Sequence, residues 1–148
     1  PGALPAVAGY TALAGQIDLT AIMIFGLLFI WQLPHFYAIA IFRRDEYTAA
    51  DLPIITCVWP LQRVVSLIRW NIGLYWLLVM VSLLYVLSWP AGVVLLLVAS
   101  YWLALALRPV ADSNQWARQI FGSSLIVTLA FAAVAVINLA VVQLTTLY

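Results

Sequence analysis

Three side chains that could bind a ligand lie within one turn of an apolar stretch. The stretch reads W-Q-L-P-H-F-Y-A-I-A and sets Trp31, Gln32 and His35 three and four residues apart. In a helix these spacings bring side chains to one face. An unpartnered polar group inside a membrane costs on the order of a few kcal/mol, so each needs a structural or functional reason. The motif therefore indicates either hydrogen bonds to a neighbouring helix or a ligand site.

The same turn carries a proline and lies well inside the apolar stretch. Pro34 lacks a backbone donor and crowds the carbonyl of Ile30, so we expect the helix to bend there and to leave a carbonyl open. His35 precedes Arg43 by eight residues, which is roughly 12 Å along a helix. If the helix continued for eleven residues beyond His35, Glu46 would share its face.

A charged cluster follows this stretch. It consists of Arg43, Arg44, Asp45, Glu46 and Asp51. Mg²⁺ binds carboxylates together with substrate phosphate oxygens, and arginine holds phosphate through paired hydrogen bonds, so the mixture suits diphosphate chemistry. The alternative is a solvated loop in which acidic residues balance arginines that mark the cytoplasmic side of a membrane.

The composition excludes a water-soluble globular domain. Of the 148 residues, 67% are hydrophobic and 7% are charged, against about 25% charged in soluble domains. A net charge of +1 is too small for a nucleic-acid surface, so no nucleic-acid partner is expected. The one cysteine, Cys57, excludes an internal disulfide framework. We therefore expect an integral membrane protein in the lipid bilayer.

The apolar runs predict an all-α, polytopic bundle of transmembrane helices with four full spans and one partial span. A helix needs about 20 residues to cross the hydrocarbon core. The expected spans are 20–42, 70–89, 91–107 and 116–143, with a partial one at 1–17. The chain opens at Pro1 without an initiator Met, so we expect this first span to be truncated.

All six arginines fall in or beside two of the connections, near residues 43–69 and 108–118. Alternate threading of the four spans puts both connections on one face, and the positive-inside rule makes that face cytoplasmic.

The last span carries Ser124, Thr128 and Ala132 at four-residue intervals. Small residues at this spacing permit close helix packing, so we interpret this stripe as structural.

Four motifs resemble the protohaem IX farnesyltransferases (haem O synthases) of the UbiA-type intramembrane prenyltransferase superfamily. They are G-A-L-P-A-V-A-G-Y at 2–10, W-Q-L-P-H-F-Y-A-I-A at 31–40, E-Y-T-A-A-D-L-P at 46–53 and W-A-R-Q-I-F-G at 116–122. The resemblance implies a nine-helix enzyme of which residues 1–148 are the carboxy-terminal part of a single domain. The family's first acidic motif, N-x-x-D-x-x-x-D, has no counterpart here, so we expect the missing amino-terminal half as a partner and an inactive fragment without it.

The resemblance also implies roles for individual residues. The implied metal ligands for Mg²⁺ are Asp45, Glu46 and Asp51. The implied catalytic residues are Glu46, Tyr47 and Asp51. The implied substrate-binding residues are Trp31, Gln32, His35, Phe36, Arg43 and Arg44, with His35 and Trp31 assigned to the haem and the arginines to the diphosphate.

The implied reaction transfers a farnesyl group from farnesyl diphosphate to a vinyl group of haem B, which gives haem O for terminal oxidases. Haem B is then a substrate rather than a cofactor. The resemblance further implies a bacterial inner membrane, and haem A synthase or terminal oxidase assembly proteins as candidate partners. Two alternatives stay open: a UbiA-type prenyltransferase acting on an aromatic quinone precursor, and a non-catalytic haem-binding or structural membrane subunit. With one histidine, bis-histidine haem ligation within this chain is excluded.

Overall fold

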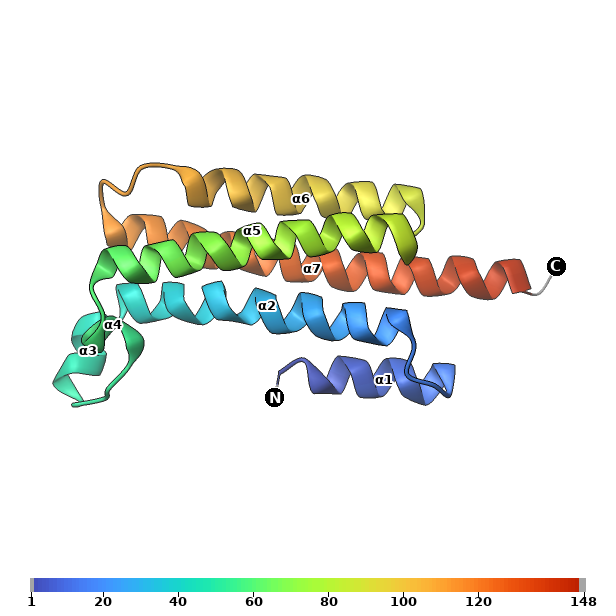
Figure 1. The fold of residues 1–148 in the computed structure, drawn as a ribbon, viewed down its shortest axis with the longest axis horizontal. Helices are drawn as coiled ribbons and strands as arrows, with labels where there is room; N and C mark the ends of the chain where they lie inside the picture. The colour runs from blue at the N-terminus through green and yellow to red at the C-terminus, as the bar shows by residue number, and fades with distance from the viewer. Residues whose placement is uncertain (1, 147–148) are drawn as a thin grey trace.

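The computed structural model describes residues 2–146, and the side chains as far as Ile137. Figure 1 shows that this part of the chain consists of helices joined by loops, as predicted. The helices, in chain order, are α1 (Leu4–Ala14), α2 (Leu19–Phe42), α3 (Arg44–Ala49), α4 (Ile55–Val58), α5 (Leu61–Tyr85), α6 (Trp89–Leu107) and α7 (Ser113–Thr146).

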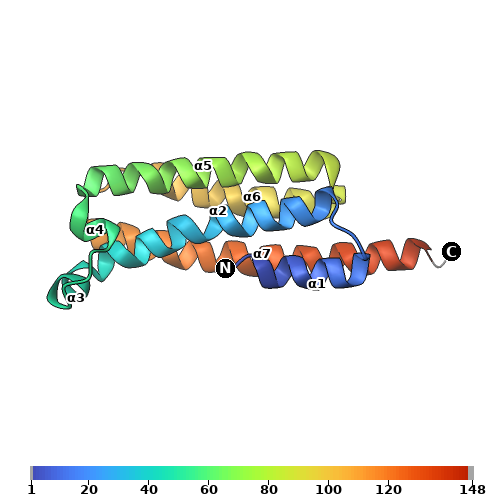
Figure 2. The same ribbon diagram turned by 60° about the horizontal axis from the view of Figure 1, so that its bottom comes forward.

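The four long helices form a ring in which each packs against two others. Helix α2 contacts α5 and α7, and α6 contacts the same two helices from the opposite corner. Figures 1 and 2 show the four running side by side, with α1 lying outside the ring along α2. The interior is apolar and includes Ile68, Ile72 and Leu95, with Tyr75 packed edge to face on Trp102 at 5.6 Å between ring centroids. Burial of this apolar surface holds the helices together.

All four ring helices are long and apolar enough to cross a membrane. They overlap the four predicted spans, and α1 is the shorter apolar helix within 1–17. The expectation of an all-α, polytopic bundle is therefore confirmed, and the chain is a multi-pass membrane protein.

Helix α5 differs most from the expected bounds of 70–89. It begins at Leu61 and ends at Tyr85. Arg63 and Arg69 therefore lie inside the helix rather than before it. Arg69 donates from Nε to the carbonyl of Ala106 at 2.9 Å and from Nη2 to that of Arg108 at 3.0 Å, both at the end of α6. Guanidinium groups satisfy open carbonyls at a helix C-terminus well, which explains how a charged residue sits on this helix.

The turn between α5 and α6 also lies earlier than expected. Trp89 is the first residue of α6 instead of part of the preceding turn, with Pro90 in the first helical turn, where its missing N–H leaves no bond unmade. The predicted span 91–107 therefore gains two residues at its start.

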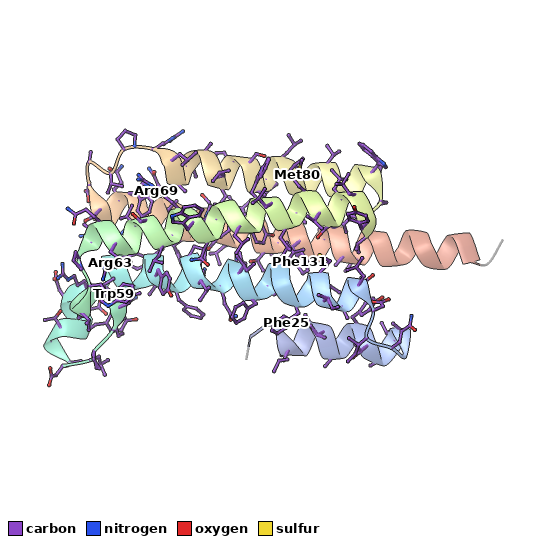
Figure 3. All side chains as sticks on the ribbon, viewed as in Figure 1. Phe25, Trp59, Arg63, Arg69, Met80 and Phe131 are labelled. Atoms are coloured by element: carbon purple, nitrogen blue, oxygen red, sulfur yellow. The ribbon has the colours of Figure 1, made fainter. Side chains whose placement is uncertain are left out.

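The arginines gather at one end of the ring, as the threading of the spans predicted. The connections 43–60 and 108–112 meet at this end, together with α3 and α4 (Figure 1). Figure 3 shows Arg63 and Arg69 there, and the guanidinium of Arg63 lies over the Trp59 ring at 5.1 Å. We call this the arginine end of the bundle.

The opposite end is closed by a capped turn between α1 and α2. Gly15 ends α1 with φ of 70°, a conformation that glycine adopts without steric cost. Asp18 caps α2 by accepting from the Ala21 N–H at 3.0 Å, and its other oxygen accepts from the Tyr10 hydroxyl at 2.7 Å. One carboxylate therefore ties the two helices together.

We predict that Gly92→Ala destabilises the bundle by about 1–3 kcal/mol, the usual cost of overpacking. A Cβ at Gly92 would collide with the Leu83 side chain, where α5 and α6 approach each other. The check is the thermal denaturation midpoint in detergent. Gly73→Ala on α5 is the matched control, because a Cβ there meets nothing within 4 Å. Equal midpoints for the two variants would contradict the prediction.

We also predict that the docking of α1 on α2 is lost in acid. The hydrogen bonds from Tyr10 and from the Ala21 N–H lower the pKa of Asp18 below its ordinary value. A carboxyl with a lowered native pKa stabilises the fold above its unfolded pKa, and that contribution disappears as the pH falls through the native pKa. The protection of the amides of residues 4–14 against hydrogen exchange, relative to the intrinsic exchange rate at each pH, should fall below about pH 4. In Asp18→Asn, exchange should be faster at neutral pH and lose this pH dependence.

Candidate functional site

Two residues of the W-Q-L-P-H motif, Trp31 and His35, contact α7 at a single serine. The Trp31 indole donates from Nε1 to the backbone carbonyl of Ser124 at 2.8 Å. His35 Nδ1 lies 2.7 Å from the Ser124 hydroxyl oxygen. Ser124 is fully buried. Trp31 and His35 share one face of α2, as predicted. Their hydrogen bonds to Ser124 hold α7 against that face.

Aromatic rings enclose the His35 imidazole. Trp31 stacks on the ring at 4.8 Å between centroids, and Phe121 of α7 lies tilted against it at 4.9 Å. Phe36 meets it edge to face at 5.3 Å. The imidazole is therefore fixed in orientation by three rings and one hydrogen bond.

Gln32, the third polar residue of the motif, lies instead beside Gly2, just before the start of α1. A Cβ built on Gly2 would lie 2.9 Å from Gln32 Oε1, so the glycine admits the amide at close range. The first and second of the four sequence motifs therefore touch at this point. Pro34 is buried inside a continuous α2.

A hollow of about 450 Å³ lies beside this cluster, towards the arginine end. It is lined by Ile39, Phe42, Arg43, Arg118 and Phe121. The Arg118 guanidinium lies over the Phe42 ring at 4.8 Å from its centroid, which is a cation–π arrangement. Phe121 also contacts His35, so the hollow and the imidazole share this wall residue. Two guanidinium groups beside aromatic walls suit a ligand that is both anionic and apolar.

Helix α2 stops at Phe42, where the predicted span 20–42 ends, so it does not continue to Glu46. Arg43 leaves the helical conformation with φ of −108° and ψ of 17°, and α3 starts as a separate helix at Arg44. Glu46 therefore does not continue the face of His35. It accepts a hydrogen bond from Arg43 Nη1 at 2.7 Å, in an exposed ion pair.

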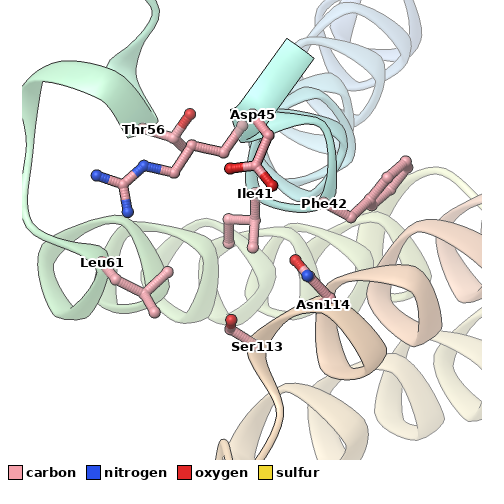
Figure 4. A pocket seen from close by; sticks show the side chains of 8 residues that line it. Ile41, Phe42, Asp45, Thr56, Leu61, Ser113 and Asn114 are labelled. Atoms are coloured by element: carbon pink, nitrogen blue, oxygen red, sulfur yellow. The ribbon is translucent and has the colours of Figure 1, made fainter. Parts of the chain in front are cut away.

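Asp45 and Arg44 line a second hollow at the arginine end, of about 200 Å³. Figure 4 shows Asp45 facing Ser113 and Asn114 at the start of α7, with Thr56 on the other side. The buried Thr56 hydroxyl donates to the carbonyl of Ala40 at 2.9 Å. This bond satisfies a carbonyl in the last turn of α2. It also fixes to that helix the connection 43–60, which carries Asp45, Glu46 and Asp51 and which we call the acidic loop.

The remaining acidic residue, Asp51, is exposed in the loop after α3. Its φ of 54° is left-handed, a conformation that aspartate tolerates better than most residues. Tyr47, half-buried, accepts at its carbonyl from the N–H of Leu52 at 3.0 Å, which closes the turn around Asp51. The loop thus holds its shape through backbone bonds.

The three predicted metal ligands do not converge on one point. In the part of the chain that the structure describes, no three side chains of His, Cys, Asp or Glu gather into a site. Mg²⁺, however, is commonly held by one or two carboxylates with substrate phosphates and water, and hard oxygen donors stand exposed on this loop. Asp45, Glu46 and Asp51 fit that incomplete kind of site.

Sequence reasoning missed three residues of this region: Arg118, Phe121 and Ser124. Ser124 was interpreted only as part of a packing stripe, because a buried serine gives no local sign of its partner. Arg118 and Phe121 lie in the W-A-R-Q-I-F-G motif, and an arginine three residues inside the predicted span 116–143 was a usable signal, since charge within a span is costly.

Comparison with known proteins places these residues in a family. The sequence model of the UbiA prenyltransferase family matches residues 1–125, which include every residue of the site described above. The chain belongs to the UbiA prenyltransferase family. No solved structure matches it.

Three curated relatives of the chain are named protoheme IX farnesyltransferases. The chain is 36% identical to "Protoheme IX farnesyltransferase 1" of Shewanella frigidimarina, over 99% of this chain and 50% of that protein. It is 41% identical to "Protoheme IX farnesyltransferase" of Yersinia enterocolitica, over 84% of this chain and 43% of that protein. The corresponding protein of Shigella flexneri is 40% identical over the same shares. The chain spans about half the length of these relatives.

We predict that Thr56→Val loosens the acidic loop. The substitution keeps the shape of the side chain and leaves the Ala40 carbonyl without its donor, at a cost of about 1–3 kcal/mol. Amide hydrogen exchange in residues 43–60 should accelerate, by about tenfold for each 1.4 kcal/mol. Thr56→Ser retains the hydroxyl and should behave like the unmodified protein. Unchanged exchange in Thr56→Val would show that the loop is held by other contacts.

Proposed function

We propose that the protein containing this chain transfers a farnesyl group from farnesyl diphosphate to a vinyl group of haem B, giving haem O and diphosphate. The observation that carries the proposal is the similarity of 84–99% of the chain to proteins named protoheme IX farnesyltransferase. The site supports it, because an anionic, apolar ligand such as haem or a prenyl diphosphate suits the hollow between α2 and α7.

In the proposed reaction, the C–O bond of the allylic diphosphate breaks and the diphosphate leaves with the electron pair. The vinyl group of haem B forms the new carbon–carbon bond, and water adds to the other vinyl carbon with release of a proton. Positive charge develops on the allylic carbon as the bond breaks. Trp31, Phe36 and Phe121 offer ring faces and edges in a dry region, where such charge is stabilised.

Arginines handle the phosphate charge in this proposal. Arg43 and Arg44 directly follow the C-terminal end of α2. Arg118 adds a third guanidinium, which lines the same hollow as Arg43. Guanidinium groups hold phosphate oxygens through paired hydrogen bonds and favour the leaving of diphosphate. In this role they act at the arginine end of the bundle, where Arg118 lies over the Phe42 ring.

Asp45, Glu46 and Asp51 are the residues we propose as oxygen ligands for Mg²⁺, with Glu46, Tyr47 and Asp51 forming the catalytic loop. Bound Mg²⁺ supplies neutralisation of the diphosphate charge. Glu46 and Arg43 form an ion pair, which holds the carboxylate beside the phosphate-binding arginine. Gln32 completes the proposed substrate-binding set through its amide, next to Gly2.

The setting follows from the charge pattern. We propose that the arginine end faces the cytoplasm of a bacterial cell, because positively charged residues favour that side of the inner membrane. The remaining half of the enzyme would complete the diphosphate site. Haem A synthase and terminal oxidase assembly proteins are the partners we propose for its product.

The test is a reaction with the full-length protein in lipid, supplied with haem B, farnesyl diphosphate and Mg²⁺, followed by mass spectrometry of the extracted haems. A farnesyl-hydroxyethyl haem is the expected product. A prenylated aromatic acid, formed when that acceptor is offered, would instead assign the protein to the quinone branch. The absence of product from either acceptor would contradict an enzymatic role.

We predict that Glu46→Ala combined with Asp51→Ala abolishes Mg²⁺-dependent turnover in this assay, because the loop then loses two of its three oxygen ligands. Asp112→Asn is the control at the same end of the bundle. Asp112 accepts from the N–H groups of Asn114 and Gln115, and the amide oxygen of asparagine can keep those bonds while removing the charge. Its turnover should stay close to that of the unmodified enzyme. Full turnover in the double variant would remove these residues from the metal site.

A further inference from the structure

The bonds around Ser124 determine which nitrogen of His35 carries the proton. The Ser124 hydroxyl donates to the carbonyl of Phe121 at 2.6 Å, and a carbonyl can only accept. A serine hydroxyl has a single proton. The contact of 2.7 Å between its oxygen and His35 Nδ1 therefore requires that Nδ1–H donates and Ser124 accepts. In the neutral imidazole, the lone pair then lies on Nε2.

Nothing in the described part of the chain uses that lone pair. No hydrogen bond to Nε2 exists there, and the rings of Trp31 and Phe121 pack against the imidazole. The lone pair lies in the plane of the ring, so a ligand of Nε2 approaches along that plane. Neutral imidazole with Nδ1–H bonded to an oxygen is the arrangement that binds transition metals through Nε2, and the second bond raises the basicity of the ligand.

We propose that His35 Nε2 is an axial ligand of the haem iron, and that Ser124 is the positioning residue that holds the imidazole in the required tautomer. The proposal rests on the function proposed above, which supplies haem B as substrate. The Nε2 lone pair forms one coordinate bond to iron; no proton moves and the iron oxidation state stays the same. Phe121, which packs on the imidazole, also lines the hollow that holds Arg43 and Arg118.

The chain offers a matched control for Ser124. Ser123 is also buried, and its hydroxyl donates to the carbonyl of Gln119 at 2.7 Å. It makes no hydrogen bond to α2 in the described structure. Ser123→Ala and Ser124→Ala therefore each remove a buried serine bond within α7, and only the second removes the acceptor of His35.

The experiment uses the full-length protein in lipid nanodiscs with ferrous haem B and no prenyl diphosphate. Resonance Raman spectra should show an iron–imidazole stretching band that disappears in His35→Ala and returns on addition of free imidazole. In Ser124→Ala the band should move to lower frequency, and haem affinity should fall by about 10- to 100-fold, the usual effect of losing a partner of a metal-bound histidine. Ser124→Thr keeps the hydroxyl and should restore both properties, and Ser123→Ala should change neither.

The inference and the proposed function fail separately. If the unmodified protein makes farnesylated haem but the iron–imidazole band is absent or persists in His35→Ala, the ligand assignment is wrong and the function stands. A spectrum and affinity in Ser124→Ala equal to those in Ser123→Ala would overturn the positioning role. If neither haem binding nor product is found with the unmodified protein, the proposed function itself fails.

Discussion

The contact between α2 and α7 at Ser124 fixes the site. Inside a membrane, no water is available to satisfy a buried donor, so the Trp31 indole and the His35 imidazole must find acceptors on a neighbouring helix. Ser124 provides two, its backbone carbonyl and its hydroxyl. Because α2 and α7 are rigid helices, these two bonds set their register along one another. That register places Phe121 against His35 and the Arg118 guanidinium over Phe42.

This packing separates two environments that the proposed prenyl transfer would need. The middle of the α2–α7 contact is apolar and aromatic, as required where a carbocation develops beside a planar acceptor. The arginine end is polar, exposed and rich in oxygen donors, as required for a diphosphate. Eight residues of helix between His35 and Arg43 keep the two about 12 Å apart. Phe42 and Phe121 join them, because both line the hollow in which Arg43 and Arg118 lie.

The arginine end is organised by open helix termini. Arg69 binds the last carbonyls of α6, and Thr56 binds the carbonyl of Ala40 near the end of α2. Each bond satisfies a backbone group that the helix itself leaves open, and each also ties two segments together. The acidic loop is thus anchored at its base while Glu46 and Asp51 stay exposed.

The sequence by itself determined the all-helical fold, four of the helices and the gathering of arginines at one end, because hydrophobic length and charge position act locally along the chain. It also brought Trp31 and His35 to one face, since helical periodicity sets that relation. Only the tertiary structure decided that α3 starts as a separate helix at Arg44, so that Glu46 does not share the face of His35. Only the tertiary structure showed Ser124 as the partner of His35, 89 residues away, because a residue's own helix face says nothing of which side chain will meet it across an interface.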